Sequence, residues 1–147
     1  MAQTLNELDL GVEIDRHDFV KMAKVLEGDD TFARQLRRVG LEDFTQSELV
    51  IARLFGVDTP YVRSVQKAGY FPPLKELVAM KIAGVDVQYI KEMASEGYEA
   101  LPVADLVELR KSGVDKEVIH EMEEHGIHTP TVQEMVEYGT SRGPVPR

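Results

Sequence analysis

The sequence predicts an all-α protein built from tandem helix-turn-helix repeats of about 29 residues. The first observation is a Gly-Val-Asp triplet that recurs along the chain, starting at Gly56, Gly84 and Gly113. The second is a further glycine that follows each triplet at a constant spacing, at Gly69, Gly97 and Gly126. A period of this length is typical of stacked supersecondary units. We therefore expect a small α-solenoid or a compact helical array.

Residues 77–105 show how one repeat is built. Apolar residues at helical spacing predict a first helix that ends at Gly84, because glycine readily takes the left-handed conformation that closes a helix. Asp86 is expected to cap a second helix by accepting hydrogen bonds from its free N–H groups. That helix ends at Gly97. Pro102 opens the next cycle, since proline is favoured in the first helical turn.

The same pattern divides the chain into an arm, a repeat domain and a tail. The repeat domain covers 16–138, with repeats at 20–48, 49–76, 77–105 and 106–134 and a half-repeat to 138. Thr45 and Glu48 predict a capping box at the start of a helix. The copy at 20–48 is degenerate, and its first glycine is displaced to Gly28. The last helix is expected to stop at Gly139.

The two ends of the chain depart from the repeat. In residues 1–15, apolar side chains alternate with polar residues or glycine in a strand-like pattern, at Leu8, Leu10, Val12 and Ile14. This segment is interpreted as an edge strand, a dimerising arm or a cap on the first repeat, and it lacks the features of a signal peptide. The tail, 139–147, is rich in Gly and Pro, and we expect it to be disordered.

Composition excludes several classes of protein. The 147 residues carry a net charge of −9, which disfavours general binding to nucleic acid or to anionic membranes. There is no Cys, so disulfides and thiolate metal sites are excluded. No apolar run approaches the ~20 residues that a membrane span requires. We expect a cytoplasmic protein without a cofactor.

The repeat has a consensus of its own. Residues 77–93 and 106–122 share the pattern Leu-Val-x-Leu/Met-Lys/Arg-x-x-Gly-Val-Asp-x-x-Tyr/Val-Ile-x-x-Met. This pattern resembles a short helical repeat of bacterial proteins, found appended to membrane metallopeptidases of the beta-lactam-sensor type. The resemblance covers residues 47–138 and leaves out the peptidase domain, so no proteolytic residue is carried over. It implies a bacterial accessory or binding module.

Two rows of basic side chains occupy equivalent positions in successive repeats. One row comprises Lys24, Arg53, Lys81 and Arg110, and the other comprises Arg34, Arg63, Lys91 and His120. Rows of cations suit an anionic peptide, a phosphate chain or an acidic helix. The alternative is that they pair with nearby acids or solvate a face. The residues predicted to bind a partner are Arg53, Arg63, Lys81, Lys91 and Arg110.

A second candidate site is apolar. Its predicted ligand-binding residues are Phe55, Tyr61, Phe71, Met80, Tyr89, Met93 and Tyr98. Side chains of these types at helical spacing are most often part of a core. Phe71-Pro72-Pro73, however, interrupts the junction between two repeats, and such a stiff apolar link can rim a groove or a small-molecule pocket.

Nothing in the sequence identifies a reaction or a metal site. The histidines of His120-Glu121-Met122-Glu123-Glu124-His125 are five residues apart, whereas the zinc motif HExxH needs a separation of four. The aspartates at Asp29, Asp58, Asp86 and Asp115 are explained by helix capping. There is no nucleophile elbow, phosphate loop or dinucleotide fingerprint. We therefore expect neither a metal site nor an enzyme.

Three functions remain open. The leading one is a non-catalytic helical-repeat module that recognises a protein or peptide partner, because stacked helix pairs create an extended surface. The second is a protein that binds or sequesters a small molecule such as a drug or metabolite. The third and weakest is an acidic regulator that mimics DNA.

Overall fold

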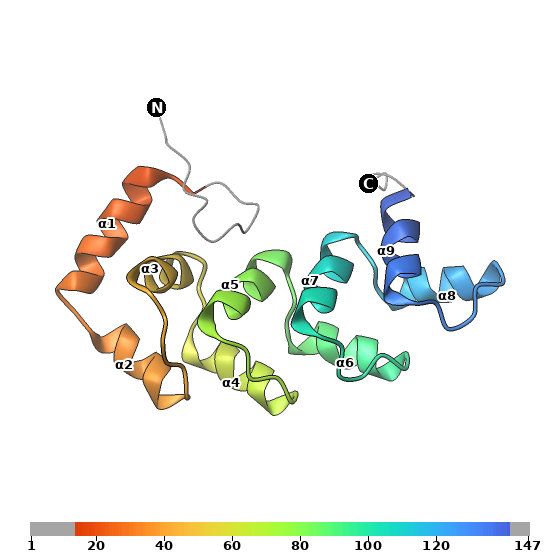
Figure 1. Cartoon of the computed structure of the whole chain (residues 1–147), viewed down its shortest axis with the longest axis horizontal. Helices are drawn as coiled ribbons and strands as arrows, with labels where there is room; N and C mark the ends of the chain where they lie inside the picture. Colours follow the sequence, from red (N-terminus) through yellow and green to blue (C-terminus); the bar gives the residue numbers. More distant parts are fainter. Residues whose placement is uncertain (1–13, 142–147) are drawn as a thin grey trace. The chain divides into compact units, whose positions relative to one another are not determined.

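Helix pairs make up the part of the chain that the computed structural model describes, residues 14–141 (Figure 1). The helices of these residues run in chain order as α1 (Arg16–Glu27), α2 (Thr31–Arg38), α3 (Gln46–Leu54), α4 (Thr59–Lys67), α5 (Leu74–Ala83), α6 (Val87–Ser95), α7 (Val103–Lys111), α8 (Lys116–Glu124) and α9 (Val132–Ser141). No strand occurs within this range, so the predicted all-α class is confirmed. The strand-like pattern at Leu8, Leu10 and Val12 lies outside the described residues.

The chain divides into two compact units, Met1–Ile82 and Ala83–Arg147. In the first unit, α1 packs against α3, and α2 and α4 lie on the other side of the array (Figure 1). In the second unit, α7 packs against α9, with α6 and α8 on the other side. Each unit therefore repeats one arrangement, in which alternate helices of the chain are neighbours.

The turn inside each repeat is built as the sequence predicts. Gly56, Gly84 and Gly113 all have positive φ angles, between 76° and 89°. The valine after each of these glycines is buried, and the N–H groups of Val57 and Val114 close their helices by bonding back to the carbonyls of Ala52 and Leu109. A Schellman-type closure of this kind satisfies carbonyls that the helix end would otherwise leave free.

The helix starts predicted at Asp58, Asp86 and Asp115 are also confirmed in detail, whereas the N-cap of α2 is Asp30 and not the predicted Asp29. Asp58, Asp86 and Asp115 each accept a hydrogen bond from the backbone N–H three residues further on, at 2.9–3.0 Å. Thr45 and Glu48 form both bonds of a capping box. Acidic groups at helix N-termini also complement the helix dipole, so the row of aspartates is accounted for by capping in these repeats.

Three local predictions are corrected. Gly28 has a φ of −89° and closes α1 without the left-handed conformation. Pro102 is the N-cap residue of α7, one position before the first helical turn. Helix α9 does not stop at Gly139 but continues to Ser141. Position 139 requires glycine for packing and not for ending the helix, because a Cβ atom there would lie 2.5 Å from the Ser112 carbonyl oxygen.

The core of each unit consists of the apolar stripes of these short helices. Fully buried side chains include Leu36, Ile51 and Leu77 in the first unit and Leu106, Met122 and Met135 in the second. Helices of this length are marginal in isolation, so their burial against neighbours is what stabilises them. None of the helices in residues 14–141 is both long and apolar enough to cross a bilayer.

Candidate functional site

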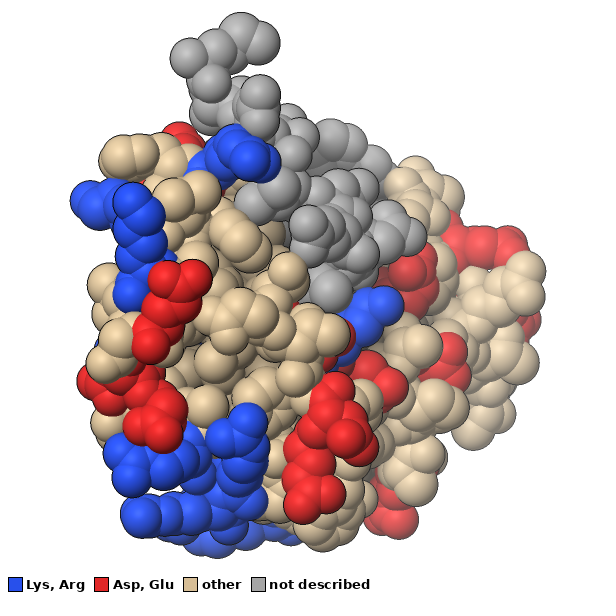
Figure 2. Space-filling view, turned by 60° about the vertical axis from the view of Figure 1, so that its left-hand side comes forward, with Lys and Arg blue, Asp and Glu red and all other residues tan. Residues whose placement is uncertain are grey.

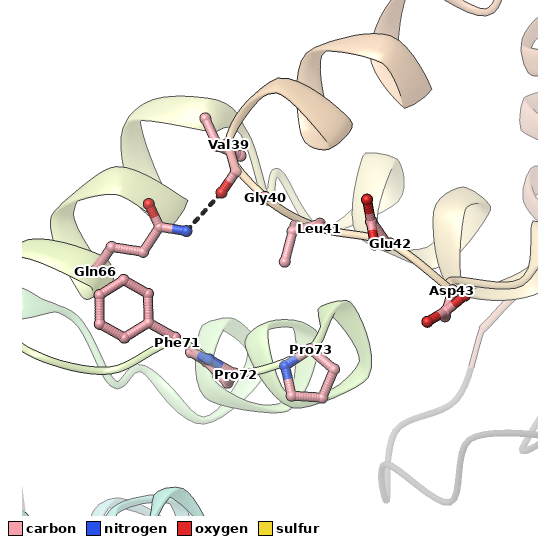
Figure 3. A pocket seen from close by; sticks show the side chains of 9 residues that line it. All are labelled: Val39, Gly40, Leu41, Glu42, Asp43, Gln66, Phe71, Pro72 and Pro73. Carbon is pink, nitrogen blue, oxygen red and sulfur yellow. Dashed lines mark hydrogen bonds between the residues drawn. The ribbon is translucent and has the colours of Figure 1, made fainter.

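A groove in the first unit lies between the α2–α3 connection and the segment that joins α4 to α5 (Figure 3). Its volume is about 540 Å³. It is lined by Val39, Gly40, Leu41, Glu42, Asp43, Gln66, Phe71, Pro72 and Pro73. We call it the Phe71 groove. Its volume is within the range of ligand and peptide-anchor pockets.

The wall formed by the α2–α3 connection is held in place by backbone bonds. Gly40, with a φ of 94°, turns the chain out of α2, and the Leu41 N–H bonds back to the Leu36 carbonyl at 3.1 Å. Leu41 is buried and projects toward the two prolines of the opposite wall (Figure 3). The Gln66 side-chain amide donates to the Val39 carbonyl at 2.7 Å and ties this wall to α4.

The opposite wall is the stiff segment Phe71-Pro72-Pro73. The Pro72 side chain is buried, whereas Phe71 is 77% exposed. Pro73 contributes its carbonyl to the first turn of α5, where it accepts the Leu77 N–H at 3.1 Å. Because proline fixes φ and has no N–H to donate, neither Pro72 nor Pro73 can continue α4. The backbone that carries the Phe71 ring is therefore restricted at the mouth of the groove.

The end of the groove opposite Phe71 is acidic. Glu42 and Asp43 are both exposed and lie at that end (Figure 3). Asp43 has a φ of 61°, a left-handed conformation that aspartate tolerates better than most residues. The next residue, Phe44, lies under the guanidinium of Arg37, at 5.1 Å from the ring centroid. That contact fixes the connection just beyond the two carboxylates.

The first basic row lies against aromatic rings. Arg53 of α3 lies over Phe32 of α2, at 5.5 Å from the ring centroid. The same contact recurs between Lys81 and Tyr61, at 4.9 Å, and between Arg110 and Tyr89, at 5.0 Å. In each case a cation from the first helix of one repeat covers the aromatic residue in the second helix of the preceding repeat. Such contacts contribute about 0.5–1 kcal/mol each at exposed sites, so these three residues have a role in packing.

The second basic row lies at exposed positions of α2, α4, α6 and α8. Arg34 pairs with Asp30 at 3.1 Å in an exposed geometry that stabilises little. Arg63 and Lys91 are exposed on α4 and α6. His120 is paired with Glu96. On the face shown in Figure 2, Lys and Arg gather in clusters set between acidic clusters, without forming one continuous row. Partner binding at these residues stays a prediction.

The predicted apolar ligand site is dispersed. Met80 and Met93 are fully buried, and Tyr61 and Tyr89 are buried within helix packing. The Tyr89 hydroxyl donates to the Val114 carbonyl at 2.6 Å, and burial raises its pKa well above the ordinary value. Phe55 and Tyr98 are partly exposed. Of this predicted set, Phe71 alone lines the Phe71 groove.

Sequence reasoning found three of the nine residues that line this groove. It singled out Phe71-Pro72-Pro73 as a rim, because this stiff apolar link interrupts the junction between two repeats. It missed the residues of the α2–α3 connection and Gln66. The available signal was the connection itself: after Gly40, which ends α2, Leu41 to Phe44 carries two adjacent acids between two apolar residues.

The fold and the groove together define a helical-repeat protein with a solvent-open, partly apolar groove in its first unit. No protein-family model, curated protein or solved structure matches the chain. What the protein does must therefore be inferred from the chemistry of its own residues.

Proposed function

We propose that this chain is a non-catalytic helical-repeat module that binds a partner protein in the Phe71 groove. The partner presents a short peptide segment with an apolar side chain beside a Lys or Arg. The observation that carries the proposal is the position of Phe71, a large aromatic side chain that is 77% exposed at the mouth of a groove. Aromatic anchors in pockets supply most of the energy at protein interfaces.

Preorganisation supports a binding role for this groove. The two prolines restrict the segment that carries Phe71, and the Gln66 bond to Val39 fixes the opposite wall. A partner that binds here therefore orders few groups that were free before, which lowers the entropic cost of association.

Charge supports the choice of partner. The groove offers apolar contacts from Phe71, Leu41 and the prolines at one end and the carboxylates of Glu42 and Asp43 at the other. A basic side chain in the partner complements those carboxylates, and complementary charge favours specific encounter. An acidic or phosphorylated segment would be repelled from the same end.

A binding role is preferred to catalysis because of what the described residues offer. Within 14–141, no charged residue is buried, and the Asp29 carboxyl, whose pKa is lowered by its hydrogen bonds from Thr31, is fully exposed. Catalytic groups usually lie in enclosed sites. The resemblance of residues 47–138 to a bacterial accessory repeat agrees with a binding module, and a cytoplasmic location remains part of the proposal.

The test is peptide selection against matched variants. A random peptide display library is selected on the wild-type chain, and the enriched peptides are measured against Phe71→Ala and Val25→Ala. Val25 is the matched control, because it is 61% exposed on α1 and does not line the groove. We expect binding at least tenfold weaker for Phe71→Ala and unchanged for Val25→Ala, with the same melting temperature for all three. Peptides that bind Phe71→Ala as well as wild type would refute the proposal.

A second pair of variants tests the charge of the partner separately. Glu42→Gln with Asp43→Asn removes the carboxylates of the groove, and Glu27→Gln with Glu76→Gln removes two exposed carboxylates elsewhere in the same unit. We expect only the first pair of substitutions to weaken peptide binding, and the affinity that remains should no longer depend on salt concentration. Equal effects of the two pairs would refute the proposal that the partner is basic, but would not count against binding in the Phe71 groove.

A further inference from the structure

In the second unit, one imidazole and two carboxylates converge at the ends of α6 and α8. Glu96 is the C-cap residue of α6, and His120 and Glu123 lie one turn apart on α8. One ligand atom from each of the three side chains lies within 4.8 Å of the other two. The His120 Nε2 atom is 2.8 Å from Glu96 Oε1. Sequence reasoning missed this grouping because it searched for metal ligands within a single helix.

The backbone that carries these side chains is fixed by packing. Met93 on α6 and Ile119 and Met122 on α8 are buried, and they lie next to the three residues in sequence or one turn away. The Lys116 N–H donates to the Glu92 carboxylate at 3.3 Å, which adds a second tie between α6 and α8. The Glu96 side chain is only 17% exposed. Packing thus fixes the backbone positions of the three residues, while the His120 side chain is 53% exposed and Glu123 is also exposed.

An independent electrostatic observation points to a cation at this place. The last turns of α1 to α5 and of α7 each contain a Lys or Arg, which complements the negative end of the helix dipole. The last turns of α6, α8 and α9 contain neither. Of these three helices, α6 and α8 carry Glu96 and Glu123 at or beside their ends, so carboxylates add to the negative end of each dipole.

We propose that Glu96, His120 and Glu123 form a binding site for a divalent transition-metal ion of the Zn²⁺ class. Zinc accepts one imidazole nitrogen and two carboxylate oxygens at about 2.0–2.2 Å, with water at the remaining position. Ligand atoms held tetrahedrally at those distances lie roughly 3.3–3.5 Å apart. The 2.8 Å contact between His120 Nε2 and Glu96 Oε1 must therefore open slightly to admit the ion. The imidazole selects against Ca²⁺ and Mg²⁺, which take oxygen ligands. The ion links α6 to α8 and stabilises the second unit, independently of the Phe71 groove.

Isothermal titration with Zn²⁺ tests the site on the full chain in a non-chelating buffer. His120→Ala removes the imidazole, and Glu96→Gln with Glu123→Gln removes both carboxylates. His125→Ala with His128→Ala is the matched control, because both histidines are exposed close by and neither belongs to the cluster. We expect one ion per chain for wild type and for the control, and affinity at least tenfold weaker for the other two variants.

A second measurement keeps the proposal open to refutation if a variant folds poorly. In the wild-type chain, the His120 ring signals should shift on addition of one equivalent of Zn²⁺, while the His17 ring signals stay in place. The proposal would be refuted if His120→Ala still bound Zn²⁺ as wild type does, or if the control variant lost binding. It would also be refuted if the His120 ring signals did not shift.

Discussion

Gly139 provides a stability test in which local and tertiary effects have opposite signs. It lies inside α9, where an exposed glycine would cost the helix about 0.5–1 kcal/mol relative to alanine. On helix propensity alone, Gly139→Ala should therefore stabilise the chain. The structure predicts the reverse, because an added Cβ would lie 2.5 Å from the Ser112 carbonyl oxygen and 3.1 Å from the Val114 Cγ2 atom.

The magnitude follows from which atom must move. The Ser112 oxygen belongs to the backbone at the C-cap of α7 and cannot rotate away as a side chain would. Overpacking of this kind costs about 1–3 kcal/mol. After the gain in helix propensity is subtracted, we expect Gly139→Ala to destabilise the second unit by about 1 kcal/mol, within a range from about 0 to 2.5 kcal/mol.

Native-state hydrogen exchange of the α7 and α9 amides is the assay, because it reports local opening of the second unit. Thr140→Ala is the control, since it places the same side chain at the next, exposed position of α9. We expect faster exchange in Gly139→Ala and a change within about 0.5 kcal/mol in Thr140→Ala. Slower exchange in Gly139→Ala would refute the close approach of α9 to the end of α7.

Two further predictions concern hydrogen bonds. Tyr89→Phe leaves the Val114 carbonyl without the hydroxyl that bonds to it at 2.6 Å, and we expect a loss of about 1–2 kcal/mol in urea unfolding. An unchanged midpoint of urea unfolding would show that this buried hydrogen bond adds nothing to the stability of the fold. The pKa of Asp29 is lowered chiefly by hydrogen bonds from Thr31, first from its hydroxyl and then from its N–H. Ionised Asp29 therefore stabilises the fold above its unfolded pKa, and this contribution is lost as pH falls through the lower folded value. In Thr31→Val, NMR titration should find the Asp29 pKa closer to its ordinary value, and an unchanged pKa would contradict the assignment.

The repeat could be predicted from the sequence because its signals are local. A glycine such as Gly84 and an aspartate such as Asp86 act within one turn of chain, through φ and through a bond three residues away. Such effects need no knowledge of neighbouring repeats. Gly139 looked the same in sequence, but its role depends on the Ser112 carbonyl from another helix. The two kinds of glycine cannot be separated without the tertiary contact.

The difference between local signals and tertiary contacts also explains which features of the basic rows could be predicted. Equivalent positions were predicted correctly as a series, because the period places Arg53, Lys81 and Arg110 alike. Their contacts with aromatic rings were not predicted, because each ring belongs to the preceding repeat. The sequence alone therefore did not indicate that the cations of Arg53, Lys81 and Arg110 take part in packing between repeats.

The candidate sites show where local reasoning ends. Phe71 could be singled out because two prolines follow it, and proline acts on its own backbone. Gln66 could not, because its bond to Val39 joins segments far apart in the sequence. Glu96 and His120 are likewise brought together only by the packing of α6 against α8.

The Phe71 groove is tested most directly by NMR mapping of a peptide selected on the wild-type chain. Amide signals are recorded for the uniformly labelled protein during titration with that peptide. The proposal predicts saturable shifts centred on residues 39–43, 66 and 71–73, and no such shifts in Phe71→Ala. Shifts centred on Arg63 and Lys91, with the groove unmoved, would contradict the groove and favour the exposed basic row as the binding surface.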